Sequence, residues 1–336
     1  SVEPETGVEG GRSYDQGPAS KRFDIHILSG VSAGEMQAAE RGTVRDGNLV
    51  YELEGKTYLT PIKTLRRDYR DAEGNTANQL RRWEPQDFKP RPDDIFQERL
   101  YCIQWMTRET LTSHRPEAFF AAVTEEDLAR ERKVASIVAE NLARWQEKGT
   151  VPDMAIEPGD KTDEPIRTRG WMYWHQLFSP RQLLTFVFYQ QHTKALGAIH
   201  LTPALFTIQS KSLEWNTRLC RWATSERHEN QVNTFSNQAL NTLFNFGVRA
   251  HPNLKNHSIF DFGESGVPIL TDALISAIPA GEIATDSHLF VTDPPYADAV
   301  TYHEITEFFI AWLRKNPPPP FDQWTWDSRR DLAIKG

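Results

Sequence analysis

The sequence contains few cysteines and no long apolar run, and each absence excludes a class of protein. Only Cys102 and Cys220 occur among 336 residues, which are too few and too far apart for a disulfide framework or a zinc ribbon. No run of about 18 apolar residues is present, so we expect no membrane span. The chain opens with Ser-Val-Glu-Pro and lacks a charged-then-apolar leader. These absences favour a protein of the reducing cytoplasm.

An excess of basic residues is lacking as well. The chain has 38 Lys and Arg against 46 Asp and Glu, a formal charge of −8 at pH 7, whereas a general nucleic-acid binder is usually basic. A hydrophobic fraction of 39%, with 10 Trp and 18 Phe, indicates folded globular material. At 336 residues the chain is long enough for about two domains.

Composition divides the chain into four parts. Residues 1–21 are rich in Gly, Ser, Glu and Pro and predict a flexible tether. Residues 22–150 predict a mixed α+β region, which we interpret as an insertion that recognises a target. The polar residues 151–168, with three prolines, predict a linker. Residues 169–336 predict a helical segment that leads into part of an α/β domain.

Local patterns predict the elements within these parts. A strand is expected over residues 22–28, and a hairpin is expected over 49–53 and 56–60 around the turn Glu54-Gly55. A capping box at Thr124–Asp127 begins a helix that we expect to stop at Gly149. Further helices are expected after the Ser179-Pro180 cap until near Gly197, over most of residues 201–250, and over the apolar stripe Ile305, Phe308, Phe309, Trp312 and Leu313.

Residues 63–91 form a locally basic stretch. They include eight basic residues against five acidic ones, with Tyr69 and Trp83 among them. An acidic protein that binds nucleic acid must concentrate its cations locally, so this stretch is the candidate surface for DNA phosphates. A solvated charged surface is the alternative, and Arg181 and Arg218 would then be the next candidates. The expected DNA contacts are Lys63, Arg66, Arg67, Arg70, Arg81 and Arg82.

The most informative motif is Asp293-Pro294-Pro295-Tyr296, which follows the apolar run 288–292. It has the form of the tetrapeptide with which amino-methyltransferases hold an extrahelical base. The lone pair of an exocyclic amine is delocalised into the base, and hydrogen bonds accepted by the Asp293 carboxylate and the Pro294 carbonyl would free it. Pro294 and Pro295 fix φ and remove backbone donors, and Tyr296 offers a face on which the base stacks. A strand-ending turn is the alternative, since Pro-Pro is common in loops.

The residues before the tetrapeptide predict part of a Rossmann-like sheet of the S-adenosylmethionine-dependent methyltransferase type, an α/β fold. Residues 286–292 form the expected strand that leads into the tetrapeptide, and residues 268–273 predict a neighbouring strand. Ligands bind at the carboxyl ends of such strands. Asp272 is therefore the candidate contact for the adenine amine of S-adenosylmethionine, with a turn or a helix cap as the alternative role.

The segment 259–266 superficially resembles the Gly-rich loop that cradles the methionine part of this cofactor, but the spacing excludes it. The elements between such a loop and the tetrapeptide take roughly 70 residues, and only 26 residues separate Gly266 from Asp293. The 40 residues after Tyr296 contain one expected helix and a proline run, where a complete sheet needs about three more strands. We expect the chain to carry part of a catalytic domain.

Seven segments form an ordered set of further motifs. They are Arg169-Gly170-Trp171, Leu177 to Leu184, Arg218 to Trp222, Asn237 to Asn241, Thr292 to Tyr296, Tyr302, and Phe308 to Arg314. Together they resemble the large adenine-specific DNA methylases that often carry a zinc ribbon and occur in bacterial phage-defence gene clusters, including DISARM-type systems. The resemblance is strong over residues 169–336 and weaker before.

This resemblance implies N6-adenine methylation of DNA with S-adenosylmethionine as cofactor, other defence-system subunits as partners, and a cofactor loop ahead of Ser1. The family's zinc ribbon has no counterpart because its cysteine pairs are absent, so no metal site is expected. One alternative is a DNA- or partner-binding module without its own cofactor site. Others are N4-cytosine methylation and methylation of RNA or protein glutamine, which use related motifs. Aspartate at position 293 favours DNA adenine.

Overall fold

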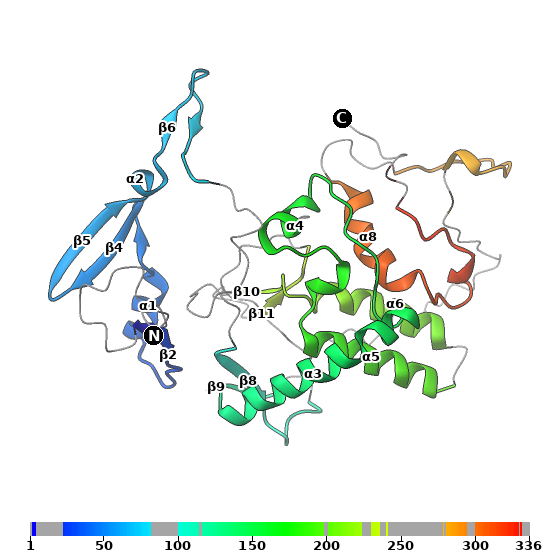
Figure 1. Cartoon of the computed structure of the whole chain (residues 1–336), viewed down its shortest axis with the longest axis horizontal. Coiled ribbons are helices and arrows are strands. Elements are labelled where there is room, and N and C mark those ends of the chain that lie inside the picture. Colours follow the sequence, from blue (N-terminus) through cyan, green and yellow to red (C-terminus); the bar gives the residue numbers. More distant parts are fainter. Residues whose placement is uncertain are drawn as a thin grey trace. The chain divides into compact units, whose positions relative to one another are not determined.

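The computed structural model describes residues 2–4, 23–81, 100–113, 116–197, 201–223, 230–235, 240, 278, 280–293, 300–328 and 330. The chain divides into two compact units, Ser1–Leu128 and Ala129–Gly336, and each is described by itself (Figure 1). Within the described ranges, no helix combines the length and the apolar character that a membrane crossing requires.

In the part that the structure describes, the first unit consists of short antiparallel sheets and two helices. β1 pairs with β2, β6 with β7 and β8 with β9, while β3, β4 and β5 form a three-stranded sheet. The elements are β1 (Val2–Pro4), β2 (Phe23–Ile25), α1 (Ala33–Arg41), β3 (Val44–Arg45), β4 (Asn48–Leu53), β5 (Lys56–Pro61), α2 (Ile62–Arg66), β6 (Tyr69–Arg70), β7 (Thr76–Ala77), β8 (Cys102–Met106) and β9 (Ala118–Ala122).

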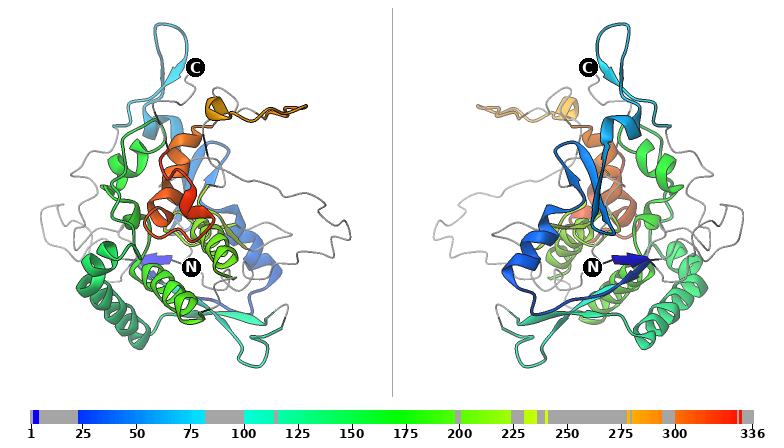
Figure 2. Two further views of the ribbon diagram at one scale, coloured as in Figure 1. Left: turned by 90° about the vertical axis from the view of Figure 1, so that its right-hand side faces the viewer. Right: turned by 90° about the vertical axis from the view of Figure 1, so that its left-hand side faces the viewer.

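The hairpin of β4 and β5 confirms the sequence prediction. Glu54 and Gly55 both have positive φ, at 52° and 74°, as expected of the two-residue turn whose twist matches that of the flanking strands. The register places Tyr51 opposite Tyr58, and both side chains are exposed. Figure 2 shows the ribbon of this hairpin from two further sides. The predicted strand over 22–28 is shorter, since β2 pairs only with the three residues of β1.

The second unit is mainly helical, and its first helix continues from the end of the first unit. α6 contacts both α5 and α8. The elements are α3 (Glu125–Glu147), α4 (Asp163–Arg169), the 3₁₀ turn η1 (Trp174–Leu177), α5 (Pro180–Ala195), α6 (Thr202–Glu214), β10 (Arg221–Ala223), β11 (Asn230–Val232), η3 (Ala280–Glu282), α8 (Tyr302–Leu313) and η4 (Phe321–Gln323).

The predicted ends of α3 and α5 are confirmed. Thr124 and Asp127 form the reciprocal capping box, with the Asp127 N–H donating to Thr124 Oγ1 at 3.2 Å and the Thr124 N–H donating to Asp127 Oδ2 at 3.0 Å. Gly149, just beyond α3, has the positive φ of 70° that a side chain would disfavour. Ser179 caps α5 and Pro180 occupies its first turn, the position where a missing N–H costs nothing.

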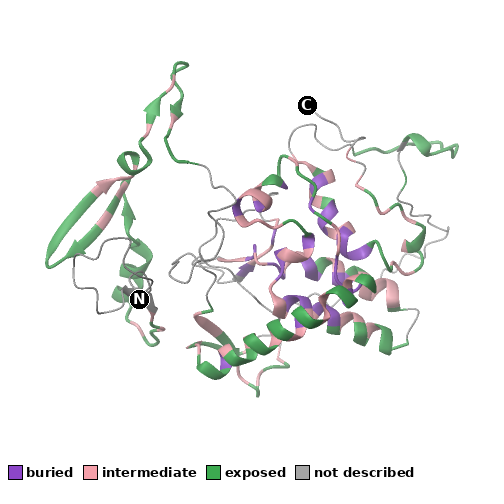
Figure 3. Ribbon diagram, viewed as in Figure 1, coloured by how far each residue is buried: buried purple, intermediate pink, exposed green. Residues whose placement is uncertain are grey.

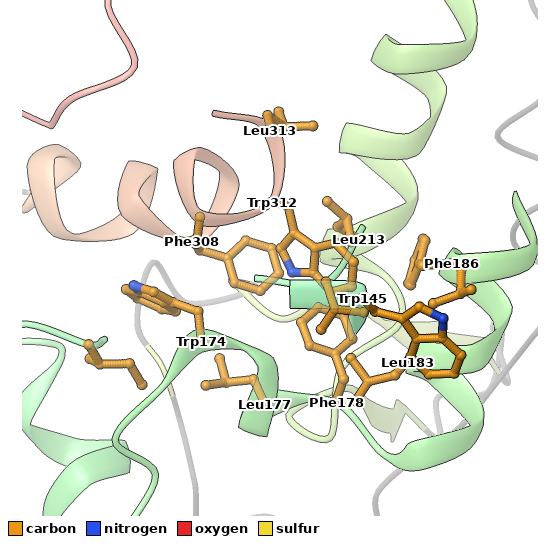
Figure 4. Close-up of a cluster of buried hydrophobic side chains, with 14 of the residues drawn as sticks. Trp145, Trp174, Leu177, Phe178, Leu183, Phe186, Leu213, Phe308, Trp312 and Leu313 are labelled. Carbon is orange, nitrogen blue, oxygen red and sulfur yellow. The ribbon is translucent and has the colours of Figure 1, made fainter. Parts of the chain in front are cut away.

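Aromatic side chains from η1, α5 and α8 form the core of this unit (Figure 4). The Phe178 ring centroid lies 5.8 Å from that of Phe308 and 4.9 Å from that of Trp312. Trp174 and Phe186 are fully buried beside them, and each such ring contributes about 1.5–3 kcal/mol relative to an exposed one. Figure 3 shows the buried positions gathered in these helices, in contrast to the exposed strands β4 and β5.

The predicted linker over residues 151–168 is wrong. Val151 is 1% exposed, Ile156 is 3% exposed and Thr162 is fully buried, and residues 163–169 form α4. The segment packs into the core of the second unit, so its prolines do not mark a boundary between two domains. The expected region 22–150 is also divided differently, because Val138 and Trp145 of α3 are buried in the core of the second unit.

Two further expectations need correction. Residues 201–250 are helical only through α6 in the part that the structure describes, because β10 and β11 then pair as an antiparallel hairpin. Residues 286–292 are not a strand, and Leu289, Phe290 and Val291 are 77%, 66% and 87% exposed. A strand requires a hydrogen-bonded neighbour, and none of the strands that the structure describes pairs with this segment. The described chain is therefore a mixture of helices and small antiparallel sheets, without the parallel pairing of a Rossmann-like sheet.

Candidate functional site

The structure describes one residue of the predicted catalytic tetrapeptide. Asp293 is exposed and is the last residue of the described segment 280–293, which contains no strand. Pro294, Pro295 and Tyr296 lie outside the described residues, and so does Asp272, the predicted cofactor contact. The structure thus leaves the side chain of Asp293 accessible to a ligand.

The helix that follows the tetrapeptide, α8, is held by a buried carboxylate near its start. Glu304 is 3% exposed and accepts hydrogen bonds from the backbone N–H groups of Asp160, Lys161 and Thr162 at 2.9, 2.8 and 2.9 Å. A Cβ at Gly159 would lie 2.5 Å from the carboxyl carbon of Glu304, so only glycine permits this approach. The backbone N–H groups of the loop before α4 therefore form a close-fitting binding site for one carboxylate group.

The electrostatics of this binding site favour the charged form of Glu304. Burial by itself would raise the pKa of this carboxyl, but the hydrogen bonds from Lys161 and Thr162 outweigh it and leave the pKa below its ordinary value. A lowered pKa in the folded state means that the contact stabilises the fold at neutral pH. The stabilisation is lost as the pH falls through that lowered pKa.

A second buried carboxylate, one turn further along α8, is held by an arginine. Glu307 is 1% exposed, and Arg330 binds it in bidentate fashion through Nε at 2.5 Å and Nη2 at 2.7 Å. The same guanidinium donates to the carbonyl oxygens of Glu157 and Pro158, both at 2.9 Å. Beyond α8, Arg314 and Lys315 both pair with Asp153.

These contacts fix α8 along its whole length to residues 153–162. Asp293 lies nine residues before the first residue of the helix, Tyr302. The helix that follows the tetrapeptide in sequence is therefore held near both of its ends by charged side chains. Glu304 and Glu307 were not among the residues expected from sequence, although their signal was available: both fall on the helix face of Phe308 and Ala311, where a carboxylate must have a partner.

The predicted DNA-contact residues form a compact basic surface on the first unit. Lys63 and Arg66 lie on α2, Arg67 follows it and Arg70 lies on β6, and all four are exposed. Arg66 pairs with Asp68 at 3.1 Å, and Arg70 donates to the carbonyl oxygen of Gly74 at 2.9 Å. Arg81 is exposed at the end of this stretch, and Arg82 lies outside the described residues.

Reversing three of these charges is expected to weaken DNA binding by removing interactions with phosphate. The triple variant Arg66→Glu, Arg67→Glu and Arg70→Glu should bind all sequences less tightly. The slope of log affinity against log salt should become shallower by about one unit for each cation that no longer meets a phosphate. Fluorescence anisotropy with a labelled duplex at several salt concentrations measures both quantities.

The control reverses three exposed cations on α3 and at its carboxyl end, namely Lys133, Arg144 and Lys148. It changes the net charge equally, so it should lower affinity only through the long-range field and leave the slope nearly unaltered. If the slope of log affinity against log salt is the same in the two variants and the parent protein, residues 63–81 do not contact phosphate and are only a solvated charged surface.

The two arginines named as second choices have different surroundings. Arg181 is engaged with Glu131 of α3 at 2.5–2.6 Å. Arg218 lies over the indole ring of Trp171, with its Cζ 5.7 Å from the ring centroid. Arg218 also lines a cavity with Trp171, His175 and Phe178. Sequence patterns do not bring these residues together, because the cavity is assembled from segments separated by about 40 residues of chain.

The described residues contain no group of three or more His, Cys, Asp or Glu side chains arranged to hold a metal ion. Comparison with known proteins yields no relative: no protein-family model, no curated protein and no solved structure matches the chain.

Proposed function

We propose that this chain contributes the base-holding tetrapeptide of an S-adenosylmethionine-dependent DNA N6-adenine methyltransferase. The observation that carries the proposal is the sequence Asp293-Pro294-Pro295-Tyr296, placed between an apolar extended segment and a helix. The exposure of Asp293 and the anchoring of α8 through Glu304 and Glu307 support it. Such a tetrapeptide needs an accessible carboxylate, and it needs a neighbouring helix that is firmly anchored.

The roles of the residues follow from the chemistry of an exocyclic amine. Asp293 and the Pro294 carbonyl accept hydrogen bonds from the two N–H groups of N6, which draws the nitrogen toward tetrahedral geometry. Tyr296 stacks on the extrahelical adenine and holds it against rotation. The cofactor, when bound, would supply the methyl group that N6 accepts. The extra proton on N6 then leaves, and Asp293 is its nearest acceptor.

The cofactor supplies an electrophilic methyl group when bound, and the lining of the cavity beside Trp171 does not fit it. The cavity beside Trp171 presents a cation, Arg218, and the described residues that line it include no carboxylate, whereas the ribose hydroxyls and the ammonium group of S-adenosylmethionine need acceptors. We therefore propose Asp272 as the residue that binds the adenine amine of the cofactor. Formation of a Rossmann-like sheet that includes the segment around Asp272 is part of the same proposal.

A DNA-binding module without its own cofactor site is the second candidate function. The observation that favours it is the basic surface of Lys63, Arg66, Arg67 and Arg70 on a hairpin-rich unit. In that case other defence-system subunits would act on the DNA that this chain holds. Duplex binding without methyl transfer, measured on the same preparation, distinguishes this module from the enzyme.

The role of Tyr296 provides the direct test of base holding. Tyr296→Phe keeps the aromatic face and should retain most of the methyl-transfer activity, whereas Tyr296→Ala should lose about 1–3 kcal/mol of base stacking, or roughly 5- to 150-fold. Transfer of a radiolabelled methyl group to an adenine-containing duplex measures both variants. Equal losses would assign the role to the phenolic hydroxyl and contradict stacking.

A further inference from the structure

A cavity of about 280 Å³ lies where three segments of the second unit meet. Trp171 follows α4, Phe178 follows η1, Pro180 begins α5, and Arg218 follows α6. Sites for drug-sized molecules occupy about 300–1,000 Å³. This cavity is therefore suited to a single ring system rather than to a complete nucleotide cofactor.

The walls of the cavity are held by backbone hydrogen bonds. The N–H of Arg218 donates to the carbonyl oxygen of Leu177 at 2.7 Å. Gln176 Oε1 accepts from the N–H groups of Met172 and Tyr173 at 2.6 and 3.0 Å. The floor, Phe178 and Leu183, belongs to the buried core. A ligand would enter a preformed site and lose little affinity to ordering of the protein.

The chemistry of the lining favours a flat, electron-rich ring. The Arg218 guanidinium already lies over the Trp171 indole, and both side chains are only partly buried. None of the described residues that line the cavity is acidic, so a ligand cation has no counter-charge there. Burial lowers the pKa of His175, although a hydrogen bond to the Pro152 backbone and the charge of Asp153 oppose this. The imidazole of His175 is thus neutral at physiological pH and contributes the polar edge of its ring to the lining of the cavity.

Guanidinium planes and aromatic faces are the surfaces on which proteins stack unpaired nucleobases. We propose that this cavity holds one unpaired nucleobase of the bound DNA, stacked against the Arg218–Trp171 pair. This base is a different one from the adenine that Asp293 and Tyr296 hold. The inference rests on the proposed function only in taking DNA as the polymer that supplies the base.

Binding of single-stranded DNA tests the site in the full chain without any methyl transfer. Arg218→Lys retains the charge but loses the plane, so it should weaken binding of a labelled 12-nucleotide strand by roughly 5- to 150-fold, the loss of one stacked base, with an unchanged salt slope. Arg181→Lys is the matched control, since Arg181 pairs with Glu131 and does not line the cavity. It should bind within about twofold of the parent protein.

An abasic strand separates stacking from phosphate contact. The parent protein should prefer the normal strand over a fully abasic strand of equal charge, and Arg218→Lys should lose most of that preference. No preference in the parent protein, or a drop for Arg218→Lys accompanied by a shallower salt slope, would overturn the proposal and make Arg218 a phosphate contact. Trp171→Phe, which keeps a ring, should retain the preference, and its loss in this variant would contradict stacking.

Photo-crosslinking gives a second and independent readout. A strand containing 5-iodouracil should attach to the tryptic peptide of residues 170–181, which carries Trp171 and His175, and unlabelled strand should compete. Crosslinks confined to the basic surface of the first unit would refute the cavity while leaving the proposed function intact. Crosslinking at residues 170–181 in a full-length protein that transfers no methyl group would sustain the cavity and refute the enzyme.

Discussion

Asp293→Ala is expected to lower the rate of methyl transfer by about 10²–10⁴-fold, the range typical for loss of a positioned acceptor of protons. The carboxylate acts on the N6 amine and not on phosphate, so affinity for duplex DNA should change by no more than a few-fold. Radiolabelled methyl transfer and anisotropy binding, carried out on the same protein, measure the two effects separately. A catalytic loss without a binding loss is the signature of a group that acts in the transition state.

Asp286→Ala is the matched control for this prediction. Asp286 lies in the same exposed segment, seven residues before Asp293, and carries the same charge. The control should keep the parent activity, because the proposed mechanism gives its carboxylate no role at the base. Activity of Asp293→Ala above about a tenth of the parent rate would remove Asp293 from the site.

Arg330→Ala is expected to destabilise the second unit by about 3–5 kcal/mol, because it leaves the buried carboxylate of Glu307 without its charged partner. The Ser328 hydroxyl, at 2.8 Å, would still donate to it, but a neutral donor does not replace a guanidinium. For a unit of about 200 residues, this loss lowers the melting temperature by on the order of 10 °C. Thermal unfolding followed by circular dichroism at neutral pH measures the change.

An exposed pair in the same unit supplies the comparison. Arg314 lies 2.9 Å from Asp153, and both side chains are more than a third exposed, so Arg314→Ala should cost no more than about 1 kcal/mol. Replacing Glu307 and Arg330 together by Leu and Met should cost less than Arg330→Ala alone, since no buried charge then remains at this position. Equal effects for Arg330→Ala and Arg314→Ala would show that the buried pair has no special role.

Local signals in the sequence predicted much of the secondary structure. The turn Glu54-Gly55, the cap at Thr124 and the Ser179-Pro180 start each depend on residues within a few positions, and the structure confirms all three. The prediction of a linker over residues 151–168 was wrong because its polar residues were assumed to be exposed to solvent. In the structure, Thr162 is buried by a partner, Glu304, located 142 positions away.

The candidate site could be predicted only where its functional residues are adjacent in the sequence. The tetrapeptide at 293–296 could be found because its four residues are adjacent, and the basic surface could be found because Arg66, Arg67 and Arg70 lie within one short stretch. The Arg218–Trp171 pair joins residues that are 47 positions apart in the sequence, and no local pattern indicates such a contact. The strand expected over 286–292 shows the opposite error, since apolar residues alone do not specify a hydrogen-bonded partner.

The anchoring of α8 also determines when the second unit can complete its core during synthesis. Glu304 meets a loop made more than 140 residues earlier, and Phe308 and Trp312 fill the space around Phe178. A ribosome adds about 5–20 residues per second, so α3, α4 and α5 wait on the order of ten seconds for the helix that covers them. Over that interval Phe178 and Phe186 lack the ring contacts that Phe308 and Trp312 of α8 provide in the folded unit.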